Sequence, residues 1–242
     1  MPDRNANPDP SGAGSHYRAI SATFVGHLTA RRVLGFGRLT AEPTAGDHIA
    51  DLHITDADDL AEAVRSGIVS FRLPGLAAAE LVGFRIRPGA DSGIDVVATA
   101  ALALAEALAH DGRAATAMTD GTDGLFLIGF GVGPTNFDGG AQGYAVALTA
   151  SAPEIGTTDA DDADGRALLI PVRPGDRWGL PAPYSLVPAG PALGVIAPLT
   201  LDEVAAVTAG MPLDVQPSDV VSRIAEYGDL AAGLAEATRG AA

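Results

Sequence analysis

Residues 119–130 read TDGTDGLFLIGF, a stretch in which two Asp-Gly pairs, three residues apart, lead directly into an apolar segment. Glycines followed by such a run predict a turn that opens into a buried strand. Turns of this shape often bind phosphate, because their backbone N–H groups and a nearby cation attract an anion. Here the turn carries Asp120 and Asp123 where Ser, Thr or Lys is usual, so its charges oppose an anion.

The charge balance of the chain limits its partners. The 242 residues include 30 acidic and 15 basic side chains, for a net charge of −15, and every basic residue is Arg. Because DNA affinity depends on neutralising phosphates with a basic patch, strong nucleic-acid binding is disfavoured. A local group of arginines could still bind an anion. The absence of Cys excludes disulfides and thiolate metal sites.

The apolar content is that of a folded protein outside the membrane. It amounts to 47% of the residues, enough for a substantial core, and no apolar run reaches the length of a membrane span. Residues 1–16 are polar and rich in Pro and Gly, so we expect a disordered tail without a secretion signal. Residues 17–242 are expected to form a single domain, and the expected location is cytoplasmic.

Helix and strand signals alternate along the chain, which predicts an α+β fold of mixed layers. Thr55 with Asp58, and Thr200 with Glu203, each have the spacing of a helix-starting capping box. The expected helices span 56–66, 95–110, 200–210, 218–227 and 229–238. The expected strands span 68–73, 79–89, 114–118, 125–130, 144–150 and 167–172.

The strand predicted at 79–89 has a polar face. Val82, Phe84 and Ile86 alternate with Gly83, Arg85 and Arg87. Since neighbouring side chains of a strand point to opposite sides, both arginines belong to one face and the apolar side chains to the other.

Several stretches, in order, resemble the polymerase domain of bacterial ligase D, a member of the archaeo-eukaryotic primase superfamily. They are GIVSFRLPG, LVGFRIRPG, the Ala/Leu helix, AMTDGTDGLFLIGF, APYSLVPAGPALGVIAPLTLDEV and SRIAEYGDL. The resemblance covers roughly residues 56–232, with an N-terminal part that looks shortened. It implies two closely packed α/β modules around a central cleft, and nucleotidyl transfer that fills DNA ends during non-homologous end joining.

The same resemblance implies that the metal site is lost. In the family, two acids on the strand matching FRIRPG and a third acid on a later strand hold two divalent metals. Here the first two positions are Arg85 and Arg87, and the third falls at or near Pro171. Because a guanidinium keeps its charge in proteins, these arginines repel Mg²⁺. We therefore expect no catalytic residue, no metal and no cofactor; Mg²⁺ or Mn²⁺ would be expected only if the site were active.

The nucleotide-binding positions implied by the resemblance are altered as well. Asp120, Asp123 and Phe126 replace the family's Ser, Lys and His of the loop, Arg72 replaces a His, and Leu186 replaces an Arg. The remaining positions of this set are Thr119, Gly121, Gly124, Tyr184 and Ser185. Since acids became arginines on the strand while the loop gained acids, we predict that Arg85 and Arg87 pair with Asp120 and Asp123. A separation beyond about 8 Å would refute that pairing.

Three functions follow as alternatives. The first is an inactive interaction or accessory module, with another protein as partner and a possible link to DNA repair. The second is a nucleotide- or anion-binding domain that uses Arg72, Arg85 and Arg87 without metal. The third is a working polymerase, primase or nuclease that recruits other acids, namely Asp91, Asp95 and Asp176.

Other polar clusters have simpler interpretations. The acidic loop 157–166 resembles a calcium loop, but with Gly165 at the sixth position Ala160 and Pro171 stand where carboxylates are required. His48 and His53, beside Asp47 and Asp51, have a spacing that fits neither a helix face nor a strand face, which favours surface histidines. Trp178 is either an exposed anchor or part of the core edge. Tyr184 and Ser185 either contact a nucleotide or pack a turn.

Overall fold

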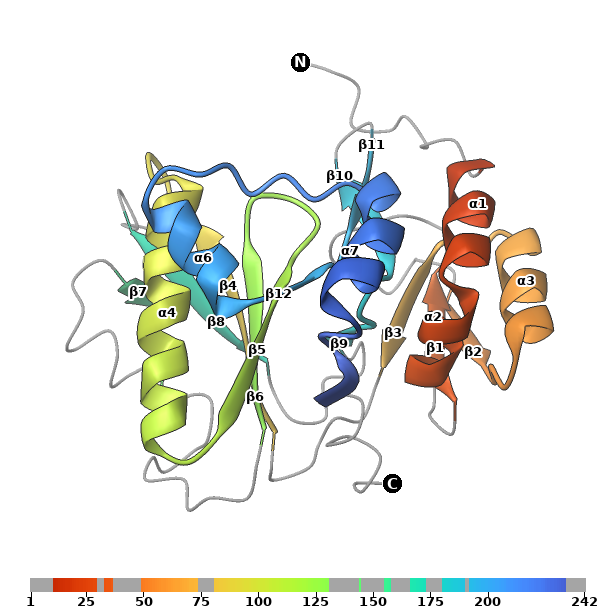
Figure 1. Ribbon diagram of the computed structural model, residues 1–242, viewed down its shortest axis with the longest axis horizontal. Coiled ribbons are helices and arrows are strands. Elements are labelled where there is room, and N and C mark those ends of the chain that lie inside the picture. Colours follow the sequence, from red (N-terminus) through yellow and green to blue (C-terminus); the bar gives the residue numbers. More distant parts are fainter. Residues whose placement is uncertain are drawn as a thin grey trace. The chain divides into compact units, whose positions relative to one another are not determined.

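The computed structural model describes residues 11–29, 33–36, 49–73, 81–130, 144, 155–157, 166–172, 180–189 and 192–233. The chain forms two compact units, whose elements are labelled in Figure 1. Unit 1 comprises Met1–Leu76, Gly175–Ala197 and Val215–Ala242, and unit 2 comprises Ala77–Pro174 and Pro198–Asp214. Both contain helices and mainly antiparallel sheets, so the predicted α+β class is confirmed.

Unit 2 is built on a six-stranded sheet of order β12-β5-β6-β4-β8-β7. All neighbouring strands are antiparallel except β7 and β8, which are parallel. The strands are β4 (Leu81–Pro88), β5 (Ala114–Thr119), β6 (Leu125–Phe130), β7 (Ile155–Thr157), β8 (Ala167–Val172) and β12 (Pro198–Leu199).

Helix α4 (Ile94–His110) covers one face of this sheet and contacts β4, β5, β6 and β8. Its Ala- and Leu-rich sequence buries Val97, Leu104 and Leu108. Gly129 of β6 permits the close approach, since a Cβ atom there would come within 2.8 Å of the Leu108 side chain. Helix α6 (Leu201–Thr208) packs against α4. No helix in the described ranges is long and apolar enough to cross a membrane.

The strand register divides the sheet into two faces. Phe84 lies opposite Leu127, and Leu127 lies opposite Ala117, so these apolar residues share the face toward α4. Arg85 lies opposite Phe126 in the neighbouring strand. The sheet therefore presents its arginines on the face away from α4, as the alternation in the sequence predicts.

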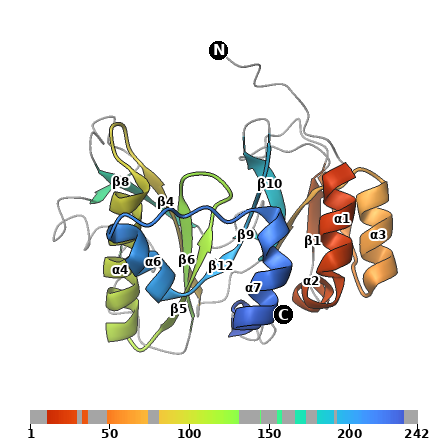
Figure 2. The ribbon, with the colours of Figure 1, turned by 45° about the horizontal axis from the view of Figure 1, so that its top comes forward.

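Unit 1 contains a four-stranded sheet of order β2-β1-β3-β9, a β10-β11 hairpin and four helices among the described residues (Figure 2). Its strands are β1 (Val33–Phe36), β2 (Ile49–Leu52), β3 (Ser70–Leu73), β9 (Leu180–Pro181), β10 (Leu186–Ala189) and β11 (Ala192–Val195). Its helices are α1 (Ser11–Ala19), α2 (Ser21–Leu28), α3 (Ala57–Arg65) and α7 (Val220–Tyr227), with the short 3₁₀ helix η1 (Pro217–Asp219) before α7.

The core of unit 1 is held by aromatic packing and buried hydrogen bonds. The ring of Tyr17 lies 5.0 Å from that of Phe24 and 5.1 Å from that of Phe71. The Tyr17 hydroxyl donates to the carbonyl of Val69 at 2.7 Å and accepts from the Leu186 N–H at 2.9 Å. One side chain thus ties α1 to β3 and to the start of β10.

Where the structure describes them, the elements predicted from the sequence are found with three corrections, whereas α2, β1, β2, β7 and β9–β12 were not predicted. Residues 11–16 are not a tail, because they belong to α1. The capping box at Thr200 and Glu203 is confirmed, but α3 is capped by Asp56, whose side chain accepts from the N–H groups of residues 58 and 59. Tyr144, at the start of the strand expected at 144–150, is helical, and the rest of that strand lies outside the described residues. Residues 234–238 of the last predicted helix also lie outside them.

Candidate functional site

The positions implied by the resemblance divide between the two units. Unit 1 contains Arg72 and the run 184–186, whereas unit 2 contains Arg85, Arg87, the loop 119–126 and Pro171. His48, Asp47, Asp176, Trp178 and most of the acidic loop 157–166 lie outside the described residues.

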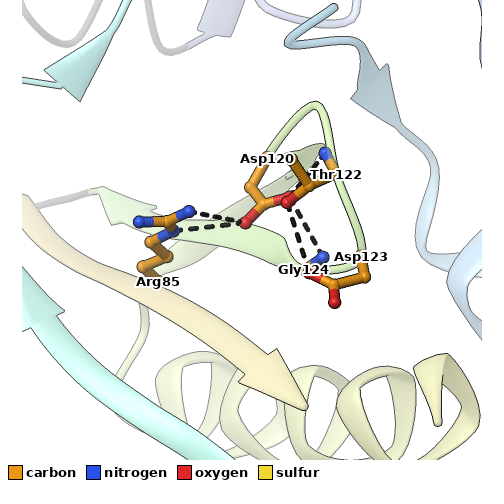
Figure 3. Close-up of polar contacts among 5 residues, drawn as sticks. All are labelled: Arg85, Asp120, Thr122, Asp123 and Gly124. Atoms are coloured by element: carbon orange, nitrogen blue, oxygen red, sulfur yellow. Dashed lines mark hydrogen bonds and ion pairs between the residues drawn. The ribbon is translucent and has the colours of Figure 1, made fainter. Parts of the chain in front are cut away.

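Arg85 and Asp120 form an ion pair across the middle of the unit 2 sheet (Figure 3). Arg85 lies on β4 and Asp120 follows β5, with β6 between them. The Arg85 Nη2 and Nε atoms donate to Asp120 Oδ2 at 3.0 and 3.2 Å. The Arg85 side chain is 13% exposed and that of Asp120 is fully buried. This part of the predicted charge exchange is confirmed.

The second carboxylate oxygen of Asp120 organises the loop. Asp120 Oδ1 accepts from the Thr122 N–H at 2.9 Å, from the Thr122 hydroxyl at 2.7 Å and from the Gly124 N–H at 3.0 Å (Figure 3). With the two bonds from Arg85, the carboxylate accepts five hydrogen bonds. Loop N–H groups of the kind that attract a phosphate are therefore directed at a carboxylate of the chain itself.

Glycines permit this arrangement at two positions. Gly121 has a φ of +80°, a conformation that side-chain-bearing residues rarely adopt. A Cβ atom at Gly124 would lie 2.6 Å from both Asp120 Oδ2 and the Ile86 carbonyl oxygen. The Gly residues that resemble a phosphate loop are thus required by the turn around Asp120.

Phe126 completes the surroundings of the ion pair. It lies directly opposite Arg85 in the β4–β6 register, and the Arg85 Cζ atom is 5.9 Å from the centre of its ring. A guanidinium within about 6 Å of an aromatic ring is attracted by the negative charge of the ring face. Phe126 therefore packs against the arginine.

The other half of the predicted exchange stays a prediction. Asp123 is exposed, its carboxylate accepts from the Thr122 hydroxyl at 3.2 Å, and it lies apart from the ion pair in Figure 3. Arg87 is half-buried two residues beyond Arg85 on β4, and therefore on the same face. A contact between Arg87 and Asp123 is not needed for the Arg85–Asp120 pair.

The β4–β8 register shows which residues of β8 share a face with the arginines. Pro171 lies opposite Phe84, so it shares the face that α4 covers rather than the face of the arginines. The residues of β8 opposite Arg85 and Arg87 are Ile170 and Leu168. Ile170, next to Pro171, is therefore the β8 residue directly beside Arg85. Guanidinium and alkyl groups offer no lone pair to Mg²⁺ or Mn²⁺, so these residues do not fit a divalent metal.

The described residues contain no other candidate metal site. Among them, no three His, Asp or Glu side chains lie close enough together to hold an ion. Asp91 and Asp95, the described acids of the active-polymerase alternative, are both exposed. Asp91 lies between β4 and α4, and Asp95 lies in the first turn of α4.

Tyr184 and Ser185 pack a turn of unit 1. Tyr184 has a φ of +67° and Ser185 is fully buried. The Ser185 hydroxyl accepts from the Phe71 N–H at 2.9 Å, and burial raises the pKa of the Tyr184 hydroxyl. Arg72 lies opposite Pro181 in the β3–β9 register. The packing alternative for the Tyr-Ser pair accounts for these contacts without a nucleotide.

A polar contact in unit 1 has no signal in the sequence. His27 Nε2 lies 2.7 Å from Asp229 Oδ2, and the His27 side chain is only 3% exposed. Burial raises the pKa of Asp229, whereas the hydrogen bond to His27 and the charge of His27 lower it. The lowering effects outweigh the effect of burial, so the pKa lies below its usual value. The two residues are 202 positions apart.

Comparison with known proteins identifies the fold. No family model matches the chain, and no curated protein matches it. A solved structure of the polymerase domain from Mycobacterium tuberculosis ligase D, in complex with DNA, superposes with a TM-score of 0.72 at 18% sequence identity. The match covers 98% of both chains, so the N-terminal part is not shortened relative to that domain. The chain therefore has the fold of a ligase D polymerase domain.

Proposed function

From this fold and from the charges within it, we propose that the chain is a catalytically inactive relative of the ligase D polymerase domain that acts as an interaction or accessory module. The observation that supports the proposal best is the Arg85–Asp120 ion pair. It puts a permanent cation, neutralised by a buried carboxylate, at a position where the resemblance implies a metal-binding acid. Nucleotidyl transfer by two metal ions requires carboxylates there.

The same ion pair argues against the anion-binding alternative. Two donors of Arg85 and the N–H groups of Thr122 and Gly124 are bonded to Asp120. A phosphate entering this loop would have to displace a carboxylate of its own sign that is fully buried. Breaking such a pair leaves an uncompensated buried charge, which costs several kcal/mol, of the order of 3–5.

We infer that the partner is another protein. The net charge of −15 opposes a phosphate backbone, and an inactive site gives no reason to bind a substrate. A link to DNA repair in the cytoplasm is proposed from the fold alone, since the similar domain from M. tuberculosis is a ligase D domain solved with DNA.

Primer extension with Mn²⁺ and ribonucleotides tests the proposal. We expect no template-dependent incorporation above a reaction without protein. Incorporation that is lost in the double variant Asp91→Asn, Asp95→Asn would overturn the proposal and support an active enzyme with recruited acids. Incorporation equal in both proteins would be tested again after a further purification step, because a contaminating polymerase gives the same result.

A thermal-shift measurement separates the anion-binding alternative. A nucleotide that binds the folded state raises stability by about 2.7 kcal/mol when its concentration is a hundred times its Kd. We expect no shift with nucleoside triphosphates in the absence of metal. A saturable shift that disappears in Arg85→Met would support the alternative instead.

A further inference from the structure

Unit 1 contains a cavity between its first helices and α3. Its volume is about 290 Å³. Helices α1 and α3 lie side by side in both Figure 1 and Figure 2, and they are in contact. The first wall includes Gly14, Arg18 and Ser21, and the second includes Ala57, Ala61 and Arg65. Because residues three to four positions apart share a face of a helix, Ala57, Ala61 and Arg65 form one face of α3. Gly14 and Arg18 share a face of α1, and Ser21 is the first residue of α2.

The size and floor of the cavity suit a single apolar side chain. Small residues, among them Gly14 and Ala61, leave the space open, and the buried Tyr17 and Leu60 also line it. Pockets that enclose a drug-sized ligand are usually about 300–1,000 Å³, so this cavity is at the lower limit of that range. It is too small to enclose a nucleotide, but large enough for the anchor residue of a bound protein.

The rim of the cavity carries charges of both signs. Arg18 makes no ion pair with any described residue, whereas Arg65 Nη1 lies 2.7 Å from Glu62 Oε2. Both partners of that pair are about 70% exposed, at 70% and 68%, so the pair contributes little and is easily exchanged. Asp58 also lines the cavity, seven residues before Arg65 on the same helix. At 1.5 Å per residue, the two charges are about 10 Å apart along α3.

We propose that this cavity is the docking site for a segment of a partner protein, which inserts one apolar side chain between α1 and α3. The segment places a carboxylate near Arg65 and a basic group near Asp58, at the two ends of α3. This inference rests on the proposed function as an interaction module, and it names the surface that the module uses.

The charges on α3 favour a protein over a nucleic acid. Asp56, Asp58, Asp59 and Glu62 all lie on or next to the helix that forms the second wall. A phosphate backbone that reached Arg65 would pass these carboxylates, whereas a peptide with both signs of charge can match Asp58 and Arg65 together. Since an extended chain rises about 3.3 Å per residue, the acid and the base of the peptide are about three residues apart.

A peptide titration tests the proposal directly. The probe is acetyl-Glu-Leu-Ala-Arg-amide, added to the ¹⁵N-labelled full chain up to about 5 mM, which corresponds to a binding free energy of about −3 kcal/mol. We expect saturable shifts of the amide signals of Gly14, Ala61 and Arg65. The peptide acetyl-Glu-Gly-Ala-Arg-amide, which lacks the anchor, is expected to give no saturable shift.

Two variants locate the binding. Ala61→Leu fills the cavity and is expected to weaken the peptide at least about tenfold, equivalent to 1.4 kcal/mol. Ala205→Leu is the matched control, because Ala205 is exposed on α6 in unit 2 and its replacement should leave binding unchanged. If Ala61→Leu fails to fold, Arg65→Glu, which changes an exposed side chain, is expected to weaken the peptide instead.

Several results would overturn the proposal. They are the absence of shifts at the highest concentration, shifts caused equally by the peptide without the anchor, and binding that survives both cavity variants. The outcome is independent of primer extension, since an active polymerase could still bind the peptide and an inactive one could fail to. Failure of the docking site and failure of the proposed function are therefore distinguished.

Discussion

The contribution of the Arg85–Asp120 ion pair to the stability of unit 2 can be measured with variants of both residues. They are Asp120→Ala, Asp120→Asn, Arg85→Met and the double variant Arg85→Met, Asp120→Ala. Asp120→Ala removes all five hydrogen bonds of the carboxylate, and the Arg85 guanidinium, 13% exposed, loses the two that it donates to Asp120. Removing one partner of a buried pair typically costs about 3–5 kcal/mol of unfolding free energy. We expect Asp120→Ala to fall in that range.

The two other single variants separate the parts of this loss. In Asp120→Asn the amide oxygen can still accept from Thr122 and Gly124, but its NH₂ group meets the donors of Arg85, so we expect a loss of about 1–3 kcal/mol. Arg85→Met removes the cation while the contacts of Asp120 Oδ1 remain. In the double variant Arg85→Met, Asp120→Ala neither buried charge is left unpaired, and we expect a coupling energy of at least about 1.5 kcal/mol.

Urea denaturation followed by far-UV circular dichroism gives the four free energies, and amide hydrogen exchange supplies the local control. The Gly124 N–H should lose protection in Asp120→Ala but keep it in Arg85→Met, because its acceptor is Asp120 Oδ1. Single-variant losses that add up to that of the double variant within about 0.5 kcal/mol would show that the two side chains do not interact. That result would refute the charge exchange and the argument for inactivity that depends on it.

Further predictions concern single substitutions at four positions. Gly124→Ala is expected to lower the unfolding free energy, measured by urea denaturation, by about 1–3 kcal/mol, because the added Cβ would clash with the Ile86 carbonyl oxygen. A Cβ atom at Gly26 would have no other atom within 4 Å, so Gly26→Ala is expected to stabilise helix α2 by about 0.5–1 kcal/mol. Thr200→Ala removes half of a capping box and should cost about 1 kcal/mol, measured as a lowered Tm. Asp229→Asn should remove a contribution to stability that depends on pH. The folded pKa of Asp229 lies below 3.8, the value of an unperturbed Asp. Its contact with His27 therefore contributes fully to stability at pH values above 3.8, and this contribution is lost as the pH falls through the folded pKa.

Each of these has an outcome that contradicts it. A stable Gly124→Ala protein would mean that the loop adapts around an added methyl group. An unchanged Tm in Thr200→Ala would show that the start of α6 is fixed by packing alone. A stability difference between wild type and Asp229→Asn that is constant from neutral pH to well below 3.8 would show that the carboxylate charge does not contribute.

The sequence was most informative where the pattern is local. The alternation around Arg85 fixes the face of β4, because the period of a strand is two residues. The pairing of Arg85 with Asp120 followed from charges of opposite sign at positions that the resemblance brings to one site. Thr200 and Glu203 were found for the same reason, since a capping box spans only three residues.

The features that the sequence did not reveal depend on contacts between distant segments. The face of Pro171 is decided by how β8 pairs with β4, and a shift of one residue moves a side chain to the other side of the sheet. Helix α1 reads SGAGSHYRA, whose Gly and Ser residues have low helix propensity, and it is held by the contacts of Tyr17 instead. The contact between His27 and Asp229 joins opposite ends of the chain and leaves no local pattern.

The charges of Arg85 and Asp120 in unit 2 are best understood together. Without Asp120, Arg85 would lose the carboxylate that it contacts beside Phe126. Without Arg85, the fully buried carboxylate of Asp120 would lose its cation. Together they satisfy each other, and Asp120 also gives the loop N–H groups a permanent acceptor. A loop that binds an external anion relies on water for those bonds when it is empty, whereas this loop does not. The pair therefore stabilises the turn, because the N–H groups that could bind an external anion are bonded to Asp120 instead. This explains how a loop with the shape of a phosphate-binding turn can carry acidic side chains.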